Sequence, residues 1–156
     1  MSNPITLQFE STLAAPRERV WSWITSIDGI LAEMRPYFRM TAPARVRGLT
    51  EVDVVPGTRL FRSYVLLFGF LPVDFSDLTL LELRSGEGFV EQSPMGSMKL
   101  WKHERWIADG PAGSTSVKLV DRLTFEPRLA RPVLKWLIRR FFEHRHAVLR
   151  ANLGAV

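Results

Sequence analysis

The start of the chain alternates between apolar and polar residues, which is the period of a β-strand with one buried face. Polar side chains occupy the even positions of residues 5–13, and apolar side chains occupy most of the odd ones. Pro16 then stands where a helix commonly begins, and Val20 and Ile24 recur behind it at helical spacing. With a further short helix expected over residues 27–34, the pattern predicts one strand followed by two helices.

Residues 37–126 carry a different pattern, in which strand-like runs are separated by turn residues. The strongest breaks are Pro56–Gly57, Gly69–Pro72, Ser85–Gly88, Ser93–Gly96 and Asp109–Ser114. This spacing predicts about six further strands. Together with the first strand, they give an expected sheet of about seven antiparallel strands.

The strand pattern gives way to one long helix from Leu129 to Asn152, with Gly154 standing where a helix commonly ends. One broad arc of the helical projection, expected to face the sheet, contains Leu134, Leu137, Ile138, Phe141, Phe142, Val148 and Leu149. Arg145 falls inside this arc, where a guanidinium is costly unless it bonds to a carboxylate, to backbone carbonyls or to a ligand. The order of elements predicts one α+β domain over residues 1–156, with a curved sheet around the terminal helix.

The composition fits a single globular domain, since the chain has 156 residues, of which 46% are hydrophobic and 24% charged. Cysteine is absent, which excludes disulfides and thiolate metal ligands and favours a cytoplasmic location. The first eight residues lack a secretory signal pattern. The longest apolar stretch, residues 64–73, is too short for a membrane-spanning helix.

The net charge of +5 comes from the C-terminal segment. Residues 1–127 hold 14 Lys and Arg against 15 Asp and Glu, whereas residues 128–156 hold seven against one. The predicted helix has a basic stripe beside Trp136, made of Arg128, Lys135, Arg139, His146 and Arg150. Such a stripe is either a solvated face or a contact for anionic lipid. Nucleic acid is not predicted as a partner, because aromatic residues are too sparse to form a stacking platform.

The last two strand-like runs, residues 98–107 and 116–126, are predicted to form a hairpin. Asp121 shares a face with apolar neighbours and is expected to point inward. Folding the hairpin about its centre places Asp121 opposite His103, Trp101 near Leu123 and Arg105 near Leu119. A cluster of His103, Arg105, Asp121 and Arg145 then either holds a polar ligand group or satisfies itself as a structural network.

Neither a metal site nor a cofactor is predicted. His144 and His146 do not share a helix face, and the glycine-rich turns lack a phosphate-binding fingerprint. No serine stands in a nucleophile-elbow pattern.

Several short segments occur in an order that resembles one superfamily. They are Ala14–Trp21, Pro56–Thr58, Trp101–His103, Gly113–Thr115, Asp121–Leu123 and Phe142–His146. Together they resemble the START-like, or SRPBCC, superfamily, which includes polyketide cyclases, birch-pollen-allergen relatives and coenzyme-Q-binding chaperones. The resemblance covers nearly the whole chain and implies the helix-grip fold, with a deep apolar cavity between sheet and terminal helix. It implies no single reaction.

The resemblance also implies where a ligand binds. Trp101 and His103 match a recurrent pair on the penultimate strand, Asp121 an aspartate on the last strand, and Arg145 the arginine after the aromatic pair of the terminal helix. The predicted ligand-binding residues are Trp101, His103, Arg105, Asp121, Leu123, Leu137, Phe141 and Arg145. Residues 72–77 and the apolar run before them are expected to line or gate the cavity.

The predicted function is binding of a hydrophobic small molecule or lipid in a carrier, sensor or storage role, without catalysis. An enzyme alternative is a polyketide aromatase/cyclase, in which His103 is the general acid or base and Asp121 orients it. In that alternative, Arg105 or Arg145 stabilises an enolate or carboxylate. A third alternative is a membrane-docking module that uses the basic face of the terminal helix.

Overall fold

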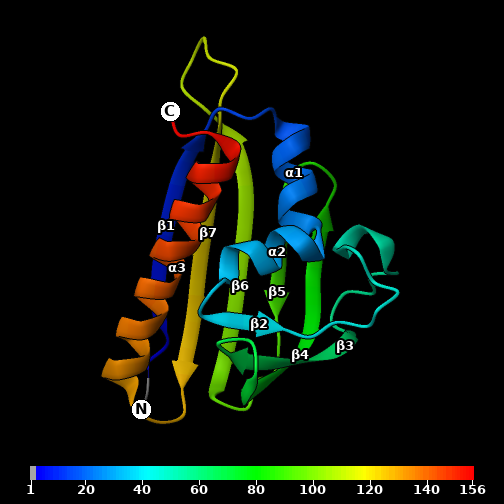
Figure 1. Ribbon diagram of the computed structural model, residues 1–156, viewed down its shortest axis with the longest axis vertical. Coiled ribbons are helices and arrows are strands. Elements are labelled where there is room, and N and C mark those ends of the chain that lie inside the picture. The colour runs from blue at the N-terminus through cyan, green and yellow to red at the C-terminus, as the bar shows by residue number, and fades with distance from the viewer. Residues whose placement is uncertain (1–2) are drawn as a thin grey trace.

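The computed structural model describes residues 3–156 as one antiparallel sheet with its helices on the concave side (Figure 1). The elements are β1 (Ile5–Leu13), α1 (Arg17–Thr25), α2 (Ile27–Met34), β2 (Phe38–Met40), the 3-10 helix η1 (Leu49–Glu51), β3 (Arg59–Leu67), β4 (Leu71–Arg84), β5 (Gly88–Gln92), β6 (Met98–Asp109), β7 (Val117–Pro127) and α3 (Arg131–Leu153). The α+β class and the helix-grip arrangement with a seven-stranded sheet are confirmed. α3 begins two residues later than expected, with a proline in its first turn.

The sheet has the strand order β1-β7-β6-β5-β4-β3-β2, so the first strand of the chain pairs with the last. Leu13 lies opposite Val117, and Ile5 lies opposite Phe125. α3 runs along β1 and β7, while α1 and α2 cross the sheet nearer its middle (Figure 1). Within residues 3–156, no helix has an apolar stretch long enough to cross a membrane.

The hairpin of β6 and β7 has a different register from the expected one. Arg105 lies opposite Asp121, and His103 lies opposite Leu123, two residues away from the predicted pairing. The cause is the connecting loop, which is centred on Gly113, a residue with the left-handed φ of +80° that glycine accommodates. The expected inward direction of Asp121 is nevertheless correct, because the side chain is fully buried.

The apolar core consists of two clusters. The upper core cluster contains Leu13, Ala15, Val20, Ile24, Leu49, Leu80, Phe89, Ile107, Val117, Leu119, Leu149 and Leu153. The lower core cluster contains Ile5, Leu7, Met98, Leu123, Phe125 and Phe142. On β7, Asp121 stands between Leu119 of the upper cluster and Leu123 of the lower one. Polar side chains therefore separate the two halves of the core.

Candidate functional site

Six ionisable side chains meet between the two core clusters, and we call them the buried polar network. They are Glu33 from α2, His103 and Arg105 from β6, Asp121 from β7, and Arg145 and His146 from α3. None is more than 5% exposed. Charged groups buried this deeply require charged or hydrogen-bonding partners, so the network is defined by how its members satisfy one another.

Arg105 lies at the centre of the network, between two carboxylates. Its Nε and Nη2 donate to Oδ1 and Oδ2 of Asp121 at 2.7 and 2.8 Å. Its Nη1 and Nη2 donate to Oε2 and Oε1 of Glu33 at 2.9 and 2.7 Å. These paired, charge-assisted bonds use the planar fork of the guanidinium, and they connect the sheet to α2.

Asp121 also accepts hydrogen bonds from two histidines. The Nε2 atoms of His103 and His146 lie 2.7 Å from Oδ1 and Oδ2 respectively. An ionised carboxylate only accepts, so both histidines carry a proton on Nε2. With the two bonds from Arg105, Asp121 accepts four hydrogen bonds, which fills its about four lone-pair sites.

Glu33 is satisfied to the same extent. Besides the two bonds from Arg105, it accepts one from Trp23 Nε1 at 3.0 Å and one from Arg145 Nε at 3.1 Å. The guanidinium of Arg145 also lies over the ring of Phe142, 4.8 Å from its centre, a favourable cation–π geometry. Arg145 is therefore held by α2 and by its own helix.

The network keeps both of its carboxylates ionised. Burial alone would raise the pKa of Glu33, but Arg105 and Arg145 outweigh it and lower that pKa. Burial is likewise outweighed at Asp121, where Arg105 and then His103 hold the pKa well below its usual value. Burial lowers the pKa of Arg145. Two carboxylates thus balance two guanidinium groups, and this arrangement suits anchoring of the helices better than proton transfer.

A chain of hydrogen bonds connects the network to the surface. The hydroxyl of Ser11 lies 2.7 Å from His146 Nδ1 and donates to it when the ring is neutral, with its one proton on Nε2. Ser11 Oγ in turn accepts from Arg150 Nη1 at 2.9 Å. The expectation that His146 belongs to an exposed basic stripe is therefore wrong.

The prediction for His146 is wrong because the buried face of α3 changes direction along the helix. The face of α3 that contacts the sheet shifts along its length, from Leu134 and Ile138 to Phe142 and Leu149. His146 lies four residues after Phe142 and three before Leu149, on their face. The same shift leaves Leu137 46% exposed, contrary to the expectation that it faces the sheet.

The predicted ligand-binding residues other than Leu137 fall into two groups, the buried polar network and the lower core cluster with its neighbours. The structure brings together His103, Arg105, Asp121 and Arg145 in the network, whereas Leu123 is fully buried in the lower core cluster. Trp101 and Phe141 are half-buried against that cluster. Sequence reasoning missed Glu33 and the role of His146. The spacing of Glu33, four residues after the buried Gly29 and one before the buried Met34, is the signal that it faces inward.

A second candidate region lies beside the lower core cluster, and we call it the lower apolar region. It consists of half-buried apolar side chains, Phe9, Met95, Trp101, Leu134, Ile138 and Phe141. Phe38 of β2 closes on it, with its ring edge-on to Phe141 at 5.0 Å between centres. Apolar side chains from α3, β1, β6 and the segment before β6 therefore meet here without full burial.

Two buried hydroxyls stand near this region without hydrogen-bond partners. Among the described residues, Ser63 Oγ and Ser76 Oγ are the buried side-chain oxygens for which no partner is found. They face each other across β3 and β4, and each residue is 1% exposed. Ser76 pairs with Met95 of the lower apolar region through an isolated β-bridge. An unpartnered buried hydroxyl costs about 1–3 kcal/mol.

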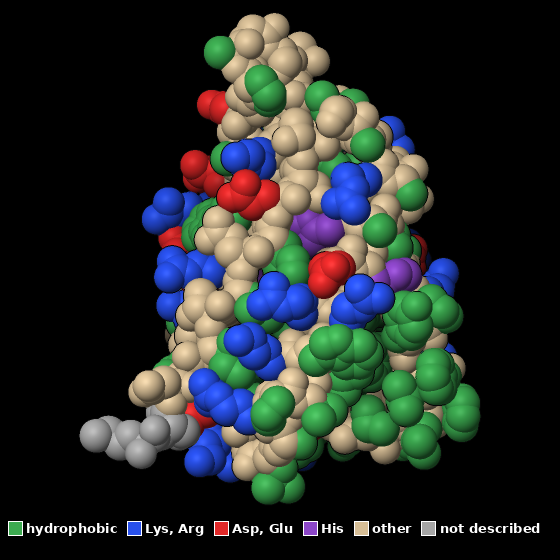
Figure 2. All heavy atoms as spheres, turned by 90° about the vertical axis from the view of Figure 1, so that its left-hand side faces the viewer, with side chains coloured by type: hydrophobic (Ala, Val, Ile, Leu, Met, Phe, Trp, Pro, Cys, Tyr) green, Lys and Arg blue, Asp and Glu red, His purple; other side chains and the backbone are tan. Residues whose placement is uncertain are grey.

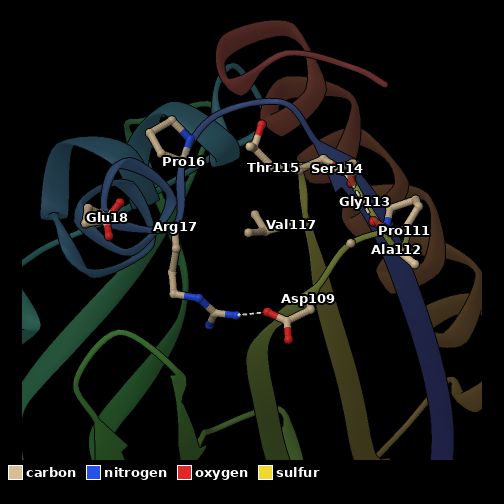
Figure 3. A pocket seen from close by; sticks show the side chains of 12 residues that line it. Pro16, Arg17, Glu18, Asp109, Pro111, Ala112, Gly113, Ser114, Thr115 and Val117 are labelled. Carbon is tan, nitrogen blue, oxygen red and sulfur yellow. Dashed lines mark hydrogen bonds and ion pairs between the residues drawn. The ribbon is translucent and has the colours of Figure 1, made fainter.

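Two surface pockets lie elsewhere. One, of about 470 Å³, lies between the start of α1 and the β6–β7 loop, where Arg17 and Asp109 form an ion pair at 2.9 Å (Figure 3). The other, of about 570 Å³, lies between α2, β2 and the segment that follows β2. Neither is lined by a residue predicted to bind the ligand. The buried polar network is closed to solvent, since none of its side chains is more than 5% exposed.

A metal ion needs several ligating side chains that converge on one point. Within residues 3–156, no three His, Asp or Glu side chains are arranged to hold a metal ion. The carboxylate of Asp121 already accepts its full set of hydrogen bonds from protein groups.

Comparison with known proteins identifies the fold. The family described as Domain of unknown function (DUF8410) matches residues 11–153. Comparison with curated protein sequences finds no match. Among solved structures, protein CV1439 from Chromobacterium violaceum has a TM-score of 0.68 and 18% identity, covering 97% of this chain and 98% of that one.

Two further structures carry informative names. A START superfamily protein from Mycobacterium smegmatis has a TM-score of 0.62 and 13% identity, covering 97% of both chains. The Zhui aromatase/cyclase from Streptomyces sp. R1128 has a TM-score of 0.65 and 11% identity, covering 96% of this chain and 93% of that one. The chain therefore has the START-like fold.

Proposed function

Because the chain belongs to the DUF8410 family and has the START-like fold, we propose that it binds a hydrophobic small molecule or lipid between α3 and the sheet. The binding site is the lower apolar region, and the role is that of a carrier, sensor or storage protein. Fold neighbours named as a START superfamily protein and an aromatase/cyclase support a ligand-binding fold family.

The observation that carries this proposal is the half-burial of the lower apolar region. Trp101 and Phe141 come from opposite sides of the grip, yet each remains partly accessible beside fully buried neighbours such as Phe142. An apolar ligand between them would complete their burial, at about 25 cal/mol for each Å² removed from water. The upper core cluster also has half-buried apolar neighbours, but none of them belongs to α3, so the half-buried apolar side chains of α3 that face the sheet are those of the lower apolar region.

The unpartnered hydroxyls refine the class of ligand. Ser63 and Ser76 face each other on the inner side of the sheet, since Ser76 lies two residues from Leu78, which packs on the upper core cluster. A carbonyl or hydroxyl group on the ligand would satisfy both. The proposed ligand is therefore mainly apolar, with one polar group that reaches β3 and β4.

The buried polar network has a positioning role in this proposal. It holds α2, α3 and the sheet together above the lower apolar region, and His103 stands two residues from Trp101 on the same strand face. His103, Arg105, Asp121 and Arg145 thereby border the site on its upper side. Phe141 belongs to its apolar wall, and the fully buried Leu123 supports that wall from the lower core cluster.

Native mass spectrometry of the freshly purified protein tests the proposal. We expect a one-to-one adduct whose released ligand extracts into organic solvent. Titration with the neutral fluorescent probe N-phenyl-1-naphthylamine then measures binding by the emptied protein. Failure of both the adduct and one-site probe binding would contradict the proposal.

Two substitutions locate the site. Phe141→Ala removes an aromatic wall of the lower apolar region and should weaken probe binding by about fivefold or more. Val55→Ala is the control, because Val55 is 57% exposed outside the region and its loss should leave probe binding unchanged. Equal weakening of probe binding in both variants would mean that the probe binds outside the lower apolar region.

The aromatase/cyclase alternative depends on the pair of His103 and Asp121. Both side chains are buried, and His103 Nε2 is engaged with an already saturated carboxylate, so the carrier role has the stronger support. His103→Gln decides between them on a panel of polyketide-like substrates. Turnover by the parent protein that is lost in the variant while probe binding persists would establish the enzyme.

A further inference from the structure

The tip of the β3–β4 hairpin exposes apolar side chains to solvent. Phe68 is 61% exposed and Phe70 73%, and Leu71 and Val73 follow at 48% each. Isolated exposed apolar residues are common on proteins, but a contiguous group of this size marks a contact surface. The hairpin tip therefore has the character of a surface that meets a partner.

The backbone of this hairpin makes the exposure more informative. Phe68 has a φ of +54° and Gly69 a φ of +85°, so both central turn residues are left-handed, a geometry that favours Asn-Gly. A bulky residue in this conformation is strained. Phe68 thus has an unfavourable backbone conformation and presents its ring to solvent, so this residue type suits an exposed contact better than it suits the turn.

Tyr37 connects the hairpin to α3. The backbone N–H of Phe68 donates to Tyr37 O at 2.8 Å, and the ring of Tyr37 lies edge-on to His144 of α3, 4.9 Å between centres. Tyr37 is itself 45% exposed. The hairpin tip, Tyr37 and α3 therefore form one continuous surface.

The first half of α3 and the residues before it add both apolar and basic groups to this surface. Its exposed apolar side chains are Leu129, Val133, Trp136 and Leu137, between 46% and 80% exposed. Its exposed basic residues are Arg128, Arg131, Lys135, Arg139 and Arg140. Residues 128–142 contain no Asp or Glu. We call the hairpin tip, Tyr37 and these α3 residues the docking face.

Figure 2 views the molecule from the side where α3 and β1 lie. Hydrophobic side chains gather in a broad field at the lower right of this view, and Lys and Arg side chains stand beside them. The arrangement is an apolar patch with a cationic border on one face of the protein.

We propose that the docking face binds the surface of an anionic lipid bilayer. The aromatic side chains of Phe68, Phe70 and Trp136 enter the interface between headgroups and acyl chains, where such groups are favoured. The basic residues of α3 meet the anionic headgroups, each contributing about fivefold to partitioning. The excess of positive charge beside apolar groups complements anionic lipid, and this inference does not depend on a ligand in the lower apolar region.

Vesicle co-sedimentation tests the proposal. The parent protein should bind vesicles that contain one third phosphatidylglycerol, should bind pure phosphatidylcholine vesicles more weakly, and should lose affinity as salt screens the charges. Neutralisation of two charges in Lys135→Gln/Arg139→Gln should lower partitioning by about 25-fold. No partitioning of the parent, or equal partitioning of the parent and this variant, would overturn the proposal.

A matched control separates the face from the net charge. Arg45→Gln/Arg122→Gln removes the same charge from exposed positions outside the docking face, since Arg45 lies after β2 and Arg122 is on the convex side of β7. This variant should bind vesicles within about twofold of the parent. An equal loss of vesicle binding in both variants would indicate that net charge alone attracts the protein, and it would overturn the assignment of binding to the docking face.

The hairpin gives the sharpest test. Phe68→Asn places the favoured residue in the turn, so the thermal midpoint should stay equal or rise, while vesicle binding should fall at least tenfold. If Phe68→Asn is less stable than the parent, Phe70→Ser takes its place in the measurement of vesicle binding. Unchanged vesicle binding in a folded hairpin variant would overturn the proposal. A parent protein that binds no vesicles, but forms a dimer that the hairpin substitution dissociates, would also overturn it. Probe binding without vesicles should be unchanged, which distinguishes this test from that of the ligand site.

Discussion

Arg105 and Asp121 face each other on β6 and β7, and two hydrogen bonds of 2.7 and 2.8 Å join them within a fully buried environment. Glu33 holds the opposite side of the same guanidinium. A charge left without its partner in such a place is costly, although the intact pair need not add net stability. Removal of one partner should therefore cost much more than the intact pair contributes.

Asp121→Asn should lower the free energy of unfolding by about 3–5 kcal/mol, because it removes the charge that Arg105 and both histidines contact. Urea unfolding followed by tryptophan fluorescence measures the change. Asp109→Asn is the matched control in the ion pair with Arg17, where Asp109 is 98% exposed, and should cost less than about 1 kcal/mol. Similar losses in the two variants would contradict the role of the network.

Acid should destabilise the protein through Glu33 and Asp121. Their pKa values are lower in the fold than the ordinary values of 4.5 and 3.8, so the unfolded chain binds more protons as the pH falls. Their stabilisation is therefore complete above about pH 5 and is lost progressively below it.

Measurements on Glu33→Gln isolate one part of this effect. The variant should be less stable than the parent at neutral pH, and the difference should shrink between about pH 5 and pH 3. Other acidic groups titrate in both proteins and cancel in the comparison. A difference that stays constant over this range would refute the assignment to Glu33.

Ser11→Ala should lower the free energy of unfolding by about 1–3 kcal/mol, since it leaves the buried Nδ1 of His146 without its hydrogen-bond partner. Thr12→Ala, on the next position of β1, should cost less than about 1 kcal/mol. Chemical denaturation of both variants measures the contrast, and equal costs would mean that the bond to His146 contributes nothing.

Ser63→Ala/Ser76→Ala should raise the free energy of unfolding by about 1–3 kcal/mol for each hydroxyl, because it removes two buried hydroxyls that lack partners. The same variant should retain less of the ligand adduct in native mass spectrometry. Ser116→Ala provides the opposite control, since its hydroxyl bonds to Ser114 at 2.8 Å and its removal should lower stability. A destabilised double variant would show that the two hydroxyls are satisfied.

Much of the fold could be predicted because alternation and helical spacing are local properties of the chain. The buried face of β7 follows from every second residue, and the second short helix has the expected bounds, Ile27–Met34. The cluster of His103, Arg105 and Asp121 follows from the same alternation. Each of these predictions needed only neighbouring residues.

The rest depended on contacts between distant segments. Glu33 meets Arg105 only because α2 crosses the sheet, and no local pattern specifies that crossing. The hairpin register depends on a loop conformation at Gly113, where a shift of the centre by one residue moves every pair by two. The direction of His146 depends on the drift of α3 across the sheet.

The pairing of β1 with β7 has a consequence for how the protein is made. During synthesis, β1 emerges early but must wait for β7 and α3, which supply its partners for strand pairing and for Ser11. Ala14 and Ala15 likewise await the carbonyls of Gly154 and Leu153. Closing so long a loop slows folding, and until then the edge of β1 and its apolar face stand open to other chains. The nascent chain is thus expected to need chaperone protection until α3 has left the ribosome.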